Sequence, residues 1–200
     1  NGKAAPVSSL AIGKGVIYIS VYNGLGFYAL VCPEVYPDMK EKGVPPINAN
    51  YRYDYSTPET SKFHAWRPES KAPVRGLAAK GSILYAACSY GGLAILQQKK
   101  SGEVKLLGYG PMKFAGDVKV EGDILWVAEG FDGLAAYKIG RGAKIEFIAR
   151  YKDFFNDGSN VACQWVFTPT SNIIAAGPRT GKYYYLDVSN LPEIRCLGHV

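Results

Sequence analysis

The segment FHAWRP, residues 63–68, brings together three side chains that can act on one ligand. His64 has an imidazole that titrates near neutral pH, Trp66 has a flat apolar ring, and Arg67 has a permanent positive charge. An aromatic ring can stack on a sugar, and a guanidinium pairs with a carboxylate through two hydrogen bonds. The trio therefore predicts a site for an anionic sugar. The alternative is a proline-flanked loop pinned by Phe63 and Trp66, with His64 merely exposed.

Further candidate side chains lie in short loops that each follow an apolar run. They are Tyr90, Glu129, Phe131, Asp132 and Arg179, with Tyr22 and Asn23 in the corresponding loop near the start of the chain. Loops held by a rigid scaffold are the usual place for binding residues. We expect these side chains to gather, with those of the FHAWRP segment, on one face. For each residue taken singly, the alternative is a solvated turn.

Several familiar sites are not indicated. The segment GPRTGKYY (177–184) lacks the spacing of a phosphate-binding loop and has no Ser or Thr after Lys182. The segment NDGSN (156–160) is too short for a calcium loop. His64 and His199 are the only histidines, and no CxxC pair occurs, so we predict no metal site and no cofactor. Acid–base catalysis by a Tyr or His remains open.

Composition indicates an ordinary globular protein. The chain has 200 residues, of which 48% are hydrophobic and 20% charged. No apolar stretch approaches the roughly 20 residues that a membrane-spanning helix needs. The net charge is +6, yet the densest basic group, Lys99, Lys100 and Lys105, surrounds a Ser-Gly turn. We therefore predict no transmembrane segment and no nucleic-acid partner.

An internal repeat organises the chain. Four segments align: VIYISVYNGLGFYAL (16–30), ILYAACSYGGLAIL (83–96), ILWVAEGFDGLAAY (124–137) and IIAAGPRTGKYYYL (173–186). Their shared glycines are Gly26, Gly92, Gly133 and Gly181, separated by 66, 41 and 48 residues. Each segment reads as strand, short glycine loop, strand, and further apolar stretches precede and follow it. Four strands in roughly 40–45 residues is the period of a propeller blade.

The sequence thus predicts an all-β fold, a single β-propeller domain of about four four-stranded blades. The expected blades are 7–56, 74–110, 114–151 and 160–200, with an insertion at 32–72 in the first. Residues 51–56 are expected as the fourth strand of that first blade. Tyr85 and Trp126 would fill the wedges between blades, because a sheet with two apolar faces must cover both. A β-sandwich of four hairpins is the alternative, but it would not require the same phrase to recur.

Two stretches, GDVKVEGDILWVAEGFDGLAAYKI and YYYLDVSNLPEIRCLGHV, resemble the LVIVD-repeat family of β-propellers. Residues 186–189 (LDVS) with Pro192 match the end of that family's phrase, and residues 126–129 (WVAE) match an earlier part, with Glu in place of Asp. The likeness covers residues 74–200 well and 7–31 loosely. It implies a propeller fold and, since members are mostly of unassigned function, little about activity. The fourth unit departs from the phrase at Gly177 and Lys182.

Four blades can close a small ring, but this kind of repeat is commoner in larger ones. We expect part of a larger ring, or a ring completed by a second chain. The four cysteines lie far apart: Cys88 and Cys163 fall in apolar runs and read as buried, and a Cys32–Cys196 disulfide would require the chain ends to meet. An extracytoplasmic or secreted location is expected, without a signal peptide in the sequence to support it.

Two functions are consistent with these features. The first is a non-catalytic binding or scaffolding propeller whose loop-rich face holds a protein or carbohydrate ligand. The alternative is a propeller enzyme, a lyase or hydrolase, acting on an acidic polysaccharide through His64, Trp66, Arg67 and Arg179, together with Tyr90 and Glu129.

Overall fold

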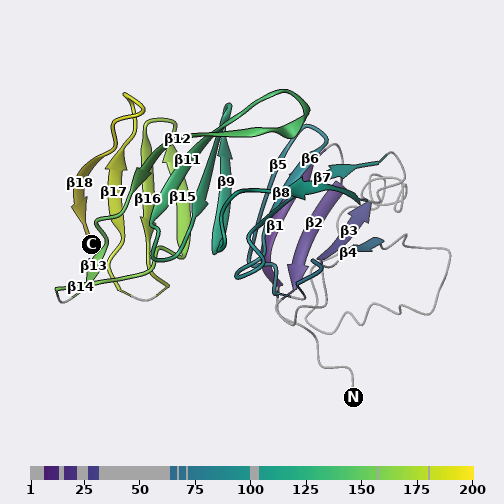
Figure 1. Cartoon of the computed structure of the whole chain (residues 1–200), viewed down its shortest axis with the longest axis horizontal. Helices are drawn as coiled ribbons and strands as arrows, with labels where there is room; N and C mark the ends of the chain where they lie inside the picture. Colours follow the sequence, from purple (N-terminus) through teal and green to yellow (C-terminus); the bar gives the residue numbers. More distant parts are fainter. Residues whose placement is uncertain are drawn as a thin grey trace, which may run out of the picture.

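The described part of the chain folds into four four-stranded antiparallel sheets that follow one another in sequence order, with a two-stranded hairpin between the third and the fourth (Figure 1). A computed structural model describes residues 7–13, 16–21, 27–31, 64–66, 68–70, 72–99, 104–156, 158–179 and 181–200. Among these residues there is no α-helix, only the short 3-10 turn η1 (Arg141–Ala143). No helix in this part of the chain is long and apolar enough to cross a membrane.

Each sheet has four strands, and strands adjacent in a sheet are also adjacent in the chain. Blade 1 contains β1 (Val7–Gly13), β2 (Val16–Val21), β3 (Phe27–Val31) and β4 (His64–Trp66). Blade 2 contains β5 (Gly76–Lys80), β6 (Ile83–Ala87), β7 (Leu93–Gln98) and β8 (Val104–Tyr109). Blade 3 contains β9 (Asp117–Glu121), β10 (Ile124–Ala128), β11 (Leu134–Ile139) and β12 (Ile145–Tyr151). Blade 4 contains β15 (Trp165–Thr170), β16 (Ile173–Gly177), β17 (Tyr184–Asp187) and β18 (Arg195–His199). A hairpin of β13 (Phe155–Asn156) and β14 (Ser159–Asn160) lies between blades 3 and 4.

The predicted all-β fold of four-stranded blades is confirmed, with one correction in blade 1. Its fourth strand is β4, which pairs with β3 through Phe27 and Trp66. The prediction that residues 51–56 supply this strand is wrong, and those residues lie outside the described part of the chain. A strand of three residues is too short to show the alternation by which sequence reading finds strands.

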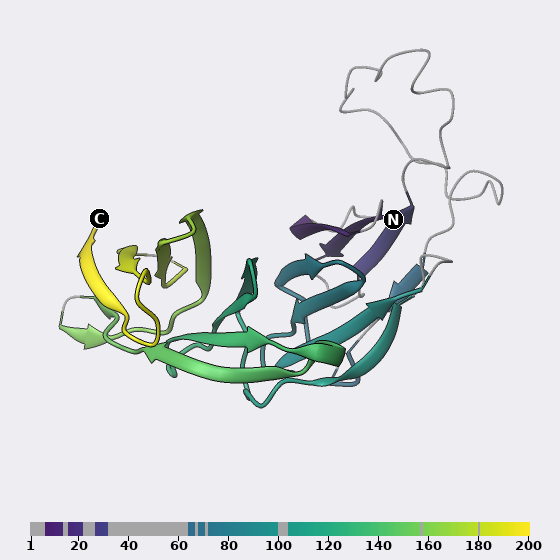
Figure 2. The same ribbon diagram turned by 90° about the horizontal axis from the view of Figure 1, so that it is seen from above.

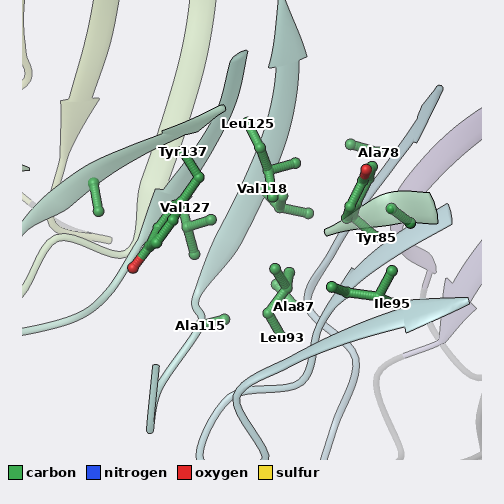
Figure 3. Packing of buried hydrophobic residues seen from close by; sticks show 12 residues of the cluster. Ala78, Tyr85, Ala87, Leu93, Ile95, Ala115, Val118, Leu125, Val127 and Tyr137 are labelled. Atoms are coloured by element: carbon green, nitrogen blue, oxygen red, sulfur yellow. The ribbon is translucent and has the colours of Figure 1, made fainter. Parts of the chain in front are cut away.

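Apolar clusters fill the spaces between successive blades. Alternation along β6 sends Leu84 and Ala86 toward blade 1. It sends Tyr85 and Ala87 toward blade 3 (Figure 3). Both faces of the strand are therefore buried. Tyr85 is 0% exposed between blades 2 and 3, and Trp126 is 1% exposed between blades 3 and 4. The two residues fill the wedges between blades as predicted.

The first strands of the blades lie next to one another, β1 against β5, β5 against β9 and β9 against β15. Two side chains connect these strands by accepting a backbone hydrogen bond from the following blade. The hydroxyl oxygen Oγ of Ser9 accepts from Leu77 N at 3.1 Å, and Oδ2 of Asp117 accepts from Val166 N at 3.3 Å. Ser9 and Asp117 hold the same register position in their blades, so the repeat extends to this contact.

The repeat also includes a β-bulge between the third and fourth strands. The register shifts after Ile95 in blade 2, after Ala136 in blade 3 and after Tyr185 in blade 4. A bulge bends its strand and increases the local twist. Its recurrence at one position indicates that the three outer strands curve in the same way.

Seen from above, the blades form an open arc with blade 1 at one end and blade 4 at the other (Figure 2). Cys88 and Cys163 are buried free thiols, as expected, and Cys196 is an exposed free thiol. The Cys32–Cys196 disulfide that the sequence left open is therefore not formed. Cys32 itself lies outside the described residues.

The wedge residues give a direct test of this packing. We expect Trp126→Ala to lower the free energy of unfolding by about 3–5 kcal/mol, because it leaves a large cavity between blades 3 and 4. The control Phe131→Ala, at a ring that is 73% exposed, should change it by less than about 0.5 kcal/mol. Urea denaturation followed by tryptophan and far-ultraviolet signals measures both. Equal effects of the two substitutions would contradict the packing.

The thiols give a second test. Burial raises the pKa of Cys88 to about 12 and also raises the pKa of Cys163, so neither forms a thiolate at pH 8. We expect iodoacetamide to modify Cys196 in the native protein, and Cys88 and Cys163 only after unfolding. Peptide mass spectrometry after a timed reaction distinguishes the sites. Modification of Cys88 in the native protein as fast as that of Cys196 would contradict the buried position.

Candidate binding face

The loops that join the second and third strands share one backbone design in blades 2 and 3. In the loop 88–92, Cys88 N donates to Gly92 O at 2.8 Å and Gly92 N donates to Ser89 O at 3.1 Å. In the loop 129–133, Glu129 N donates to Gly133 O at 2.7 Å and Gly133 N donates to Gly130 O at 3.0 Å. The two loops are 41 residues apart and close in the same way.

Each of these loops is also tied to the segment that leads into the next blade. Ser89 and Ala115 exchange two backbone hydrogen bonds, of 2.8 and 2.9 Å. Gly130 and Cys163 exchange two more, of 2.9 and 2.8 Å. The loops and connections therefore lie on one face, along the lower edge of Figure 1. We call it the loop face, defined by the loops 88–92, 129–133 and 178–183.

Glycine is required where the third strand begins. Gly133 has φ +92°, and a Cβ there would lie 2.1 Å from the carbonyl oxygen of Tyr151. Gly92 has φ +71°, and a Cβ there would lie 2.5 Å from the carbonyl oxygen of Met112. Both constraints are set by backbone atoms, which cannot move aside as a side-chain tip can. The aligned glycines of the sequence thus hold rigid turns.

At the tips of these rigid loops the side chains point to solvent. Tyr90 is 85% exposed and Phe131 is 73% exposed, and the two occupy the same loop position. The ring of Tyr90 contacts that of Phe114 edge-on, with centroids 5.2 Å apart. Arg179 is exposed at the corresponding position of blade 4. We call Tyr90, Phe131 and Arg179 the tip row; it presents one side chain per blade on the loop face.

Glu129 is different, because it is buried and fully engaged. Its residue is 3% exposed; Oε1 accepts a hydrogen bond of 2.6 Å from the Tyr137 hydroxyl, and Oε2 accepts one from Arg150. Arg150 in turn lies over the ring of Phe147, 5.3 Å from its centroid. Glu129 joins the loop to β11 and β12, and it is not presented to a ligand.

Burial and pairing act against each other on this carboxylate. Burial raises the pKa of Glu129, while the hydrogen bond from Tyr137 and the charge of Arg150 counter the rise. The corresponding residues in blades 2 and 4 are Cys88, also buried, and Gly177. This position of the repeat therefore has a packing role in every blade where it is described.

Asp132, the second acidic residue of the loop, is solvated. Its side chain is 69% exposed and lies 3.7 Å from Lys152 Nζ, with a Lys152 side chain that is 55% exposed. A pair so open to water contributes little to stability. Asp132 therefore remains available to a ligand on the loop face, next to Phe131.

The FHAWRP segment is only partly described. His64 and Trp66 belong to β4, a strand and not the expected loop, while Arg67 and the side chain of His64 lie outside the described residues. Trp66 is half-buried and packs against the cluster between blades 1 and 2. Its partner in the sheet is Phe27, where β3 begins, so Trp66 lies near the loop face. Tyr22 and Asn23 also lie outside the described residues.

Three side chains that shape this region were missed by sequence reading. They are Phe114, Tyr137 and Arg150, which contact Tyr90 or Glu129. Tyr137 and Arg150 lie on strands, and the sequence pattern of a strand does not show whether a polar side chain faces the protein interior or the solvent. Phe114 is the first residue of the expected third blade (114–151), and the 41-residue repeat places no aromatic there in other blades. No signal in the sequence therefore singled it out.

Two hollows of the described surface lie away from the loop face. One is lined by Asp187, Ser189, Asn190, Glu193 and Arg195 at the turn between β17 and β18. Another is lined by Lys80, Ile83, Tyr85, Ile139, Gly140, Gly142 and Ala143 at the turns of blades 2 and 3. Both are at the opposite edge of the blades. Among the described residues no His, Cys, Asp or Glu groups gather as a metal site would need.

No family model and no curated protein matches the sequence. Solved structures do match in fold. One match is the β-propeller domain of Cps50 (Swd1) from Myceliophteria thermophila, at 13% identity and a TM-score of 0.61. The match covers 100% of this chain and 59% of that one. Another match is the periplasmic gluconolactonase PpgL from Pseudomonas aeruginosa, at 11% identity and a TM-score of 0.62. This match covers 96% of this chain and 56% of that one.

A third match is the computationally designed Ika4 protein, at 11% identity and a TM-score of 0.57, covering 94% of this chain and 95% of the design. Identities this low establish the fold and nothing about activity. The chain has a β-propeller fold, and it spans little more than half the length of the two natural chains named above.

The two carboxylates of the blade 3 loop provide a test of the site. We expect Glu129→Ala to lower the free energy of unfolding by about 2–4 kcal/mol, since it leaves the Tyr137 hydroxyl buried and Arg150 without its partner. Asp132→Ala removes a solvated carboxylate from the same loop and should change it by less than about 0.5 kcal/mol. Chemical denaturation compares them. Equal, small effects would show that Glu129 does not brace the loop.

Proposed function

We propose that this chain is a non-catalytic binding or scaffolding propeller whose loop face holds a protein or carbohydrate ligand through the tip row. The observation that carries the proposal is the pair of exposed aromatic rings, Tyr90 and Phe131, at one position of two rigid loops. Exposed apolar side chains that lie together, and not singly, mark interaction surfaces in folded proteins. Aromatic and arginine side chains are also those that dominate the energy of protein interfaces.

The shape of the face favours an extended ligand. The two hollows described above lie at the opposite edge, and the tip row places one side chain on each of three successive blades. A peptide or glycan chain laid across the blades would meet Tyr90, Phe131 and Arg179 in turn. Since backbone hydrogen bonds hold the two aromatic loops, little conformational entropy would be lost on binding.

The alternative, a propeller enzyme acting on an acidic polysaccharide, is less well supported. Glu129 was its acidic group, and both of its carboxylate oxygens are engaged inside the protein. Asp132 and the Tyr90 hydroxyl remain exposed on the loop face, but no hydrogen bond among the described residues joins them as an acid–base pair. Membership of the LVIVD-repeat family stays a proposal as well, supported by the repeat phrase and the four-stranded units.

The proposal is tested by selecting peptides from a display library on the wild-type chain, with oligogalacturonate and neutral cello-oligosaccharides measured in parallel. We expect at least one of these probes to bind, and Tyr90→Ala/Phe131→Ala to weaken it at least about tenfold, because two aromatic contacts are lost. Calorimetry or surface plasmon resonance gives the affinities.

The matched control is Leu107→Ala/Leu197→Ala, which removes two apolar side chains that are 43% and 52% exposed on outer strands. It should leave the affinity unchanged. The proposal fails if no probe binds, or if the control weakens binding as much as the tip variant. New chain ends appearing in oligogalacturonate would instead favour the enzyme alternative.

A further inference from the structure

The two ends of the arc present sheet faces that every other blade buries. Within a blade, one face is turned toward the preceding blade and the other toward the following blade. In blade 2 the row facing onward is Ala78, Tyr85 and Ile95, at most 7% exposed, and it is covered by blade 3. No fifth sheet follows blade 4 in the described part of the chain.

The corresponding row of blade 4 is apolar and open. Register pairs Phe167 with Ala175 and Ala175 with Tyr185, so the three lie side by side across β15, β16 and β17. Phe167 is 46% exposed and Tyr185 is 39% exposed, and the ring of Phe167 also contacts that of Tyr183. Ala175 between them is 7% exposed. We call these three residues the end row.

The opposite end carries the other half of such an interface. Leu10 in β1 holds the register position that Leu77, Val118 and Val166 hold in the later blades. Those three are at most 2% exposed against the preceding blade, whereas Leu10 is 54% exposed. Beside the end row the blade 4 face carries the ion pair of Asp187 with Arg195, in the row that includes Ile173, so the face is apolar at the end row and charged next to it.

We propose that a second copy of this chain closes the ring, with the end row of each copy packed on the Leu10 face of the other. The two ends are complementary in kind, since one faces onward and the other backward. Two copies related by a two-fold axis that coincides with the central axis of the ring would cover both ends at once and leave neither open. The chain spans 59% and 56% of the two natural chains above, so two copies supply about the length of one such ring.

The mass in solution is the first test. Sedimentation equilibrium should give twice the chain mass of 21.7 kDa at micromolar concentration. Phe167→Asp and Tyr185→Asp each place a carboxylate in the contact, and each should weaken the dimer about thirtyfold or more. Because both side chains are exposed in the single chain, far-ultraviolet circular dichroism should remain unchanged. Leu107→Asp, an equally exposed position on β8, is the control and should stay dimeric.

The orientation is tested by mixing. Leu10→Asp damages the other end and should also weaken the dimer. A mixture of Tyr185→Asp and Leu10→Asp chains restores one undamaged contact per dimer, so it should associate more tightly than either variant alone. If the two end rows instead packed against each other, Leu10→Asp would leave the affinity of the dimer unchanged. A monomeric wild type would overturn the proposal, and it would be expected if a longer chain supplies further blades of its own. An assembly mass that keeps rising with concentration would overturn it as well.

Discussion

The fold depends on one constraint, the need of each four-stranded sheet to cover two apolar faces. Along β6 the side chains alternate between two different clusters, so a single strand takes part in two interfaces. Two such sheets cannot cover all of their apolar faces, because each added sheet covers one face and brings a second, uncovered apolar face with it. An array of blades is the outcome, and it ends without uncovered faces only when it closes on itself.

The same repeat explains why the loop face can vary while the blades cannot. Backbone hydrogen bonds fix the loops 88–92 and 129–133, and glycines at their ends allow a turn that no other residue fits. The tip position is free of these demands. It carries Tyr90 in one blade, Phe131 in the next and Arg179 in the last, which is where chemistry can differ at no cost to folding.

Sequence reading located the strands well because the repeat supplied four views of one pattern, and Tyr85 and Trp126 were placed correctly from their size alone. It failed at β4, which is too short to alternate visibly. It also treated Glu129 and Asp132 alike, as loop side chains presented on one face. Only the structure separates them, because the partners of Glu129 come from β11 and β12 and no spacing in the sequence brings Arg150 beside it. The recurring bulge was equally invisible, since it depends on backbone register and not on residue type.

Ring closure and the loop face are linked through the braces between blades. The loops of blades 2 and 3 are each held by the segment that leads into the following blade, through Ser89 with Ala115 and Gly130 with Cys163. The loop of blade 4, which carries Arg179, has no such following segment among the described residues. In a ring of two copies that brace would come from the start of β1 in the second copy. The interface that buries the end row would then also give the blade 4 loop the kind of backbone brace that the loops of blades 2 and 3 already have.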